Sequence, residues 1–111
     1  GGLFAQRLAQ SLTAAQGLHQ TALEKGYWSI APELDICIFS VKGSTASEIS
    51  GANRAFFEEK AKEGIHLALF SLQKTQCPWN VEWDTNSVVV VRSVLMKPEH
   101  NDETFWKAVV A

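Results

Sequence analysis

Residues 88–96, with the sequence VVVVRSVLM, decide the fold of this chain. Valine is β-branched and packs well in a pleated strand, so this run predicts a strand over residues 87–96, which Pro98 closes. Side chains alternate across a strand and therefore fall into two sets. Val88, Val90, Arg92 and Val94 lie on one face, and Val89, Val91, Ser93 and Leu95 on the other.

The other elements follow from periodicity. Short apolar runs predict strands over residues 34–41 and 65–73, and the long polar loop 74–86 favours an antiparallel hairpin between the second and third strands. Apolar spacings of three and four predict helices over residues 3–25 and 46–63 and from Asn101 or Asp102 to Ala111. The order predicts an α+β fold, a two-layer sandwich with a small, mainly antiparallel sheet of about three strands and helices on one face.

Each helix has a candidate buried stripe. Thr45 and Glu48 have the spacing of a capping box at the start of the second helix. Residues 58–63 carry five charges and are interpreted as a solvated helix face. The predicted inward side chains are Leu3, Phe4, Leu8, Leu12, Ala15, Leu18, Ala22 and Leu23 in the first helix, Ile49, Ala52, Phe56 and Phe57 in the second, and Phe105, Trp106, Val109 and Val110 in the last.

Composition narrows the class of protein. A chain of 111 residues is one domain, 1–111, and 46% hydrophobic and 20% charged residues are ordinary for a globular protein. A net charge of −2 without a basic cluster argues against nucleic acid and anionic membranes as partners. No signal peptide or membrane span is apparent, so we expect a cytoplasmic protein. In that compartment Cys37 and Cys77 are free thiols by default, and a single disulfide between them is the alternative. The histidines lack metal-ligand spacing, so we expect no metal site.

Arg92 is the candidate functional residue. It lies between valines on its own face of the strand, and a buried guanidinium without a partner is costly, so it needs an anion or water. One reading is structural: an internal carboxylate such as Asp35, or water at a sheet edge. The other is functional: the planar fork binds the carboxylate of a ligand in bidentate fashion.

Three segments together resemble the C-terminal small domain of the group II pyridoxal-phosphate amino-acid decarboxylases. They are Pro32–Phe39 (PELDICIF), Ala52–Phe56 (ANRAF) before Gly64, and Val91–Pro98 (VRSVLMKP) before a short helix. Their order and spacing carry the resemblance, which runs from Leu8 to Val110.

The resemblance implies a role for Arg92, because the arginine of the late strand contacts the substrate carboxylate in that family. It also implies an amino-acid substrate, pyridoxal phosphate as cofactor, a large domain as partner and a homodimer. Ser40 stands where the family commonly has a second arginine, and no lysine follows a histidine, as the cofactor lysine does there. We therefore expect no catalytic residue and no cofactor-binding residue in this chain, which would be inactive alone as part of a longer lyase.

Within the same fold type, an aminotransferase or a sulfur-amino-acid lyase would have a similar small domain. The alternative from a different class is a stand-alone α+β module for protein binding or oligomerisation. Under the decarboxylase reading, the face with Val88, Val90, Arg92 and Val94 is turned toward the large domain. That face would then be an exposed apolar patch in the isolated chain, and self-association would follow.

Overall fold

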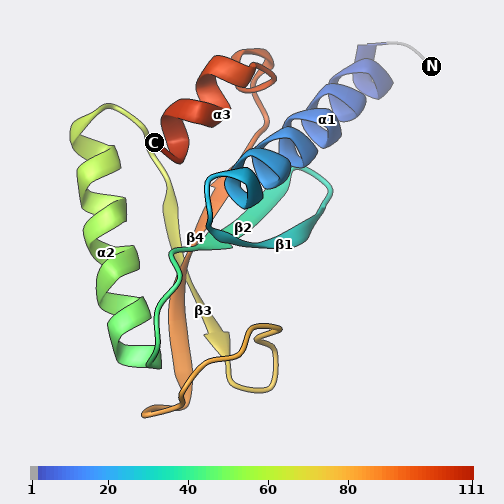
Figure 1. Cartoon of the computed structure of the whole chain (residues 1–111). Coiled ribbons are helices and arrows are strands. Elements are labelled where there is room, and N and C mark those ends of the chain that lie inside the picture. The colour runs from blue at the N-terminus through green and yellow to red at the C-terminus, as the bar shows by residue number, and fades with distance from the viewer. Residues whose placement is uncertain (1–2) are drawn as a thin grey trace.

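The computed structural model describes residues 3–111, with side chains from Ala9 onward. The fold is the predicted α+β arrangement, in which helices pack against a small antiparallel sheet (Figure 1). The elements are α1 (Leu3–Glu24), β1 (Trp28–Glu33), β2 (Ile36–Ser40), α2 (Ala46–Lys62), β3 (Ala68–Gln73), β4 (Ser87–Val94), a short 3-10 helix (Pro98–His100) and α3 (Glu103–Val109).

The sheet has four strands in the order β1-β2-β4-β3, with every neighbouring pair antiparallel. The predicted β3–β4 hairpin is confirmed, and β2 is an interior strand as expected. The first strand, β1, was not predicted: its sequence WSIAPE contains a proline and has no β-branched run. Proline is tolerated there because β1 is an edge strand. Residues 34 and 35, predicted as strand, form the turn of the β1–β2 hairpin, where Leu34 has φ 56°.

One side of the sheet, here called the helix face, carries Cys37, Phe39, Val91 and Leu95. These residues form one core with α1 and α3, and Phe56 of α2 packs against it. Phe39 is fully buried and makes edge-to-face contacts with Tyr27 and Phe56, at ring-centre distances of 6.0 and 5.8 Å. The predicted inward residues of α3 belong to this region, with Val109 and Val110 buried.

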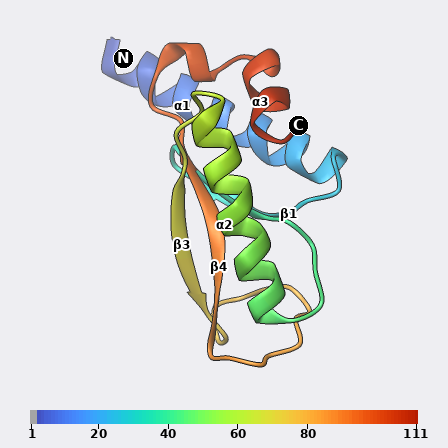
Figure 2. The same ribbon diagram turned by 90° about the vertical axis from the view of Figure 1, so that its left-hand side faces the viewer.

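The helix α2 lies beside β4 where β2 has ended (Figure 2). Its side chains take the place of a neighbouring strand there. The buried amide of Asn53 donates to the Val89 carbonyl and to Ser40 Oγ, both at 2.8 Å, and accepts from Val41 N at 3.0 Å. Asn53 therefore joins the end of β2, α2 and β4.

Several predicted burial patterns are wrong. Leu12 and Leu23 on α1 are exposed, as is Ala52 on α2. Lys60, assigned to a solvated face, is buried and donates to the Ala108 carbonyl at 2.8 Å. The lysine satisfies carbonyls at the end of α3, which a pattern of charges along α2 does not reveal.

Local signals were more successful at the helix ends. The Thr45 hydroxyl accepts from Glu48 N at 3.1 Å, so the predicted N-cap is confirmed. Asp102 caps α3 in the same way through Thr104 N at 3.0 Å. The closeness of α1 and α3 depends on Gly17, because the Trp106 ring occupies the space that a side chain at position 17 would need.

Candidate functional site

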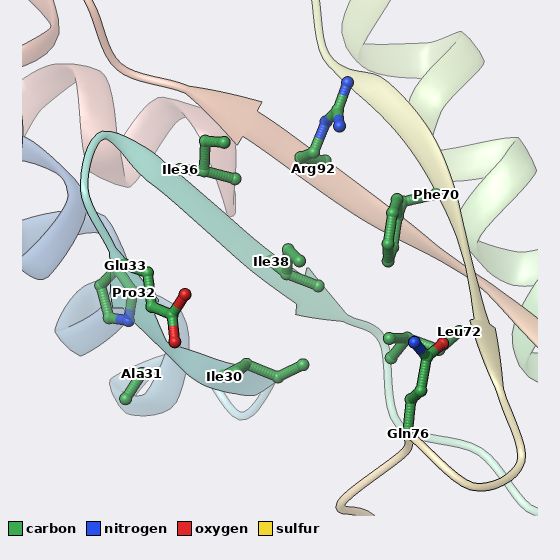
Figure 3. A pocket seen from close by; sticks show the side chains of 10 residues that line it. All are labelled: Ile30, Ala31, Pro32, Glu33, Ile36, Ile38, Phe70, Leu72, Gln76 and Arg92. Atoms are coloured by element: carbon green, nitrogen blue, oxygen red, sulfur yellow. The ribbon is translucent and has the colours of Figure 1, made fainter.

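The opposite side of the sheet, here called the Arg92 face, contains a depression of about 510 Å³ (Figure 3). Its floor is mostly apolar, and three polar side chains stand around it, Glu33, Gln76 and Arg92. The other lining residues are Ile30, Ala31, Pro32, Ile36, Ile38, Phe70 and Leu72.

Strand register explains why Arg92 is here. Ile30 pairs with Ile38, Ile38 with Arg92, and Arg92 with Ala68, so these four side chains form one row across the sheet. Directly paired residues share a face. The alternation predicted from the sequence thus places Arg92 on the face opposite Val91, away from the core that contains α1 and α3.

The Arg92 side chain is half-buried and has no partner of opposite charge. Among the described residues it makes no ion pair, and its buried Nε has no hydrogen-bond partner. Its nearest aromatic contact is the Phe70 ring, 5.9 Å from the guanidinium carbon. A permanently charged fork over an apolar floor is suited to a planar carboxylate.

The structural reading of Arg92 named Asp35 as its partner. Asp35 lies in the β1–β2 turn, where its backbone carbonyl accepts from Leu95 N at 2.8 Å. No ion pair joins Asp35 to Arg92 within residues 9–111. Glu33 lines the same depression and likewise makes no ion pair with Arg92 there.

The far end of the Arg92 face is closed. Val88 and Val90 are fully buried, although both were expected to be exposed. They belong to a cluster with Trp28 and Trp79, whose rings stack at 5.3 Å. Ala46 and Ile49 at the start of α2 belong to the same cluster. The loop 74–86 and the start of α2 therefore cover this end of the face together. At the other end Val94 is exposed, so within the described part of the chain the predicted apolar surface is present only there.

The thiols and histidines do not form a second reactive centre. Cys37 and Cys77 are free, as expected, and burial raises the pKa of Cys37 to about 11, against a smaller opposing effect of its hydrogen bond to Ser29. Cys37 therefore stays protonated and is not a nucleophile. His19 Nδ1 lies 2.6 Å from Ser29 Oγ, and burial lowers the pKa of this histidine.

Two absences hold for residues 3–111. No group of three or more histidine, cysteine or acidic side chains is arranged to hold a metal ion. No helix in that range is long and apolar enough to cross a membrane.

Sequence reasoning missed Glu33 and Gln76 as lining residues. Glu33 belongs to the strand that was not predicted, and Gln76 to the loop whose path the sequence left open. Gln76 is held in place because its Oε1 accepts from Gln73 N at 3.0 Å. A polar residue shortly after a strand is too common a pattern to have identified it.

Comparison with known proteins gave no match: no family model fits the sequence, and no curated protein or solved structure is significantly similar to the chain.

Proposed function

We propose that this chain is the small domain of a pyridoxal-phosphate-dependent amino-acid decarboxylase and that Arg92 binds the substrate carboxylate. The supporting observation is the state of Arg92. Its guanidinium lies over an apolar floor with no carboxylate partner among residues 9–111, and its Nε is buried and unsatisfied. An internal ion pair with Asp35 would have argued against this function.

The described residues that line the depression offer no lysine that could hold pyridoxal phosphate. None of the seven lysines lines the depression, and none follows a histidine. The cofactor would therefore be held by a large domain of a longer protein, and no chemical step is assigned to residues of this chain.

The contribution of this chain is positioning. When the Arg92 face closes over a bound amino acid, the guanidinium fixes the carboxylate in one orientation, and the apolar floor excludes water from it. Orienting the bond to be broken lowers the entropic part of the barrier. Both the binding and the orientation depend on the planar fork, which lysine does not reproduce.

The test uses the full-length protein with pyridoxal phosphate and a panel of amino acids. We expect a cofactor absorbance in the visible region and release of carbon dioxide from at least one amino acid. Loss of one charge-assisted, bidentate contact costs about 1.5–3 kcal/mol, so Arg92→Lys should lower kcat/KM roughly 10- to 100-fold.

The matched control is Lys62→Gln, which removes an exposed charge on α2 outside the depression. It should change kcat/KM by less than about twofold. Absence of cofactor binding would contradict the decarboxylase assignment. An unchanged kcat/KM in Arg92→Lys would contradict only the role of the arginine and would leave the decarboxylase assignment untouched.

Exposed apolar residues near the paired ends of β2 and β4 favour a second candidate function, a module for protein binding or oligomerisation. Leu34, Val94 and Met96 are 63%, 38% and 65% exposed. Sedimentation of the 111-residue chain tests this. A concentration-dependent dimer that Val94→Glu abolishes would support the module, provided that the full-length protein binds no pyridoxal phosphate.

A further inference from the structure

A second hollow, of about 240 Å³, lies between the first half of α2 and the start of β4. It shares no residue with the Arg92 depression. Its lining is polar and contains a cation but no carboxylate: Ser47, Ser50, Arg54, Thr85, Ser87 and Val89.

Ser50 is the informative residue of this hollow, because it is only 8% exposed and its donor is unused. Its Oγ accepts from Val89 N at 2.9 Å. A serine hydroxyl also carries one donor, and in a helix it commonly donates to the carbonyl four residues earlier. Thr13 and Thr21 on α1 do so, at 2.9 and 2.8 Å, but Ser50 makes no such bond within the described part of the chain. A nearly buried hydroxyl thus has a free donor at the wall of the hollow.

Arg54 lies one turn after Ser50 on α2 and lines the same hollow. It makes no ion pair among residues 9–111, and Glu58, one turn further along the helix, does not neutralise it. Thr85 and Ser87 bring further hydroxyl groups from the other side, and neither side chain has a hydrogen-bond partner in that range. Hydrogen-bond donors from α2 and from the segment that leads into β4 therefore face the same hollow.

Two carboxylates, those of Glu48 and Asp84, are adjacent in sequence to lining residues, and neither lines the hollow. The Asp84 carboxylate accepts from Ser47 N at 3.0 Å, and hydrogen bonds with Ser47 lower its pKa. Because Asp84 occupies a first-turn amide of α2, the site depends on the side chains of Ser50, Arg54, Thr85 and Ser87 rather than on the helix terminus.

We propose that this hollow binds a phosphate group, either free or esterified to a small molecule. A phosphate group offers several strong acceptor oxygens in a tetrahedral arrangement, which donors from two sides can reach together. Arg54 supplies the charge, and the hydroxyls of Ser50, Thr85 and Ser87 supply further hydrogen bonds. A planar carboxylate would use the guanidinium but leave the hydroxyls on the opposite wall without acceptors.

The experiment is a titration of the 111-residue chain with inorganic phosphate, followed by amide NMR at constant ionic strength and pH 7.5. We expect saturable shifts at Ser50, Arg54 and Ser87, in contrast to small, non-saturating shifts with chloride. Arg54→Gln should weaken binding at least about fivefold, since it removes a charge-assisted contact. Lys62→Gln, an exposed charge on the same helix outside the hollow, should weaken it less than about twofold.

A parallel titration with glycerol 3-phosphate separates the two sources of the group. Tighter binding of the ester identifies a phosphorylated small molecule, and tighter binding of the inorganic ion identifies free phosphate. Shifts no larger than those with chloride for both probes would overturn the proposal, as would equal affinities of the unmodified chain and Arg54→Gln. Arg54 is exposed, so its replacement does not endanger the fold.

Discussion

Val91 and Arg92 are neighbours on β4, yet they belong to two regions built on different principles. Val91 belongs to a continuous apolar core with residues of α1 and α3, in which the residues contributed by the sheet are fully buried. Arg92 faces a depression whose lining residues, except Leu72, are at least partly exposed, and its charge has no partner among the described residues. The helix face supplies the stability, and the Arg92 face retains groups that a second molecule or domain can satisfy.

The largest expected effect comes from Phe39 and Ile38, which are adjacent on β2 but point to opposite faces. Phe39→Ala should lower the free energy of unfolding by about 3–5 kcal/mol, because it empties a fully buried site. Ile38→Ala, which truncates a half-buried side chain, should cost about 1–2 kcal/mol. Urea denaturation followed by circular dichroism measures both.

If Phe39→Ala does not fold, Phe39→Leu provides a measurable substitute in the same position. Equal losses of unfolding free energy in Ile38→Ala and Phe39→Ala would show that the two faces of the sheet are equally well packed. The contrast drawn between the helix face and the Arg92 face would then be wrong.

Asn53 tests how α2 is fixed to the sheet. Asn53→Ala should cost about 2–3 kcal/mol, because it leaves the Val41 amide and the Val89 carbonyl without partners in a buried place. Asn80→Ala, in the exposed part of the loop 74–86, is the control and should change stability by less than about 0.5 kcal/mol. A loss of similar size in both variants would mean that apolar contacts alone hold α2.

Trp79 tests the closed end of the Arg92 face. Trp79→Ala should cost about 1–2 kcal/mol, since it removes the stack on Trp28 and part of the cover of Val88 and Val90. The depression should then extend toward the β3–β4 turn, and binding of a hydrophobic fluorescent dye should increase. Pro78→Ala, an exposed neighbour, should leave dye binding unchanged. If both variants bind equal amounts of dye, the loop does not cover this face.

The difference between the faces also explains what the sequence could predict. Alternation along residues 88–94 places Arg92 opposite Val91, because that is a local property of a strand. The helix caps at Thr45 and Asp102 are local as well. By contrast, the cover over Val88 and Val90 comes from the start of α2, from a loop without periodicity about ten positions away, and from the unpredicted strand β1. Contacts of that kind depend on the tertiary fold.

Lys60 and Asn53 are two further residues whose burial depends on the tertiary fold. Both are polar residues on α2, and a periodicity argument assigns polar residues to the solvent. They are buried because carbonyl and amide groups of distant segments need partners, at the end of α3 for Lys60 and along β4 for Asn53. A single sequence does not show which backbone groups are left unsatisfied, so this part of the fold was not predictable.

The smallest expected effect is the one that separates stability from function. Arg92→Met keeps an unbranched side chain and removes a charge that no described residue compensates. Because a buried, unsatisfied donor is unfavourable, we expect the free energy of unfolding to stay constant or rise by about 0.5–1 kcal/mol. Urea denaturation of the 111-residue chain measures this, with Lys62→Met as an exposed control expected to stay within about 0.5 kcal/mol.

The direction of that change decides what Arg92 is for. An arginine retained for the fold would have a partner within the chain. Its replacement by methionine would then lower the free energy of unfolding by more than about 1 kcal/mol, because a hydrogen bond to a charged group is lost. An arginine retained for a ligand lowers the stability of the fold. Its replacement should therefore raise the free energy of unfolding and abolish carboxylate binding. Gain of stability together with loss of carboxylate binding would therefore assign the residue to the ligand, whereas loss of stability would return it to the structural role.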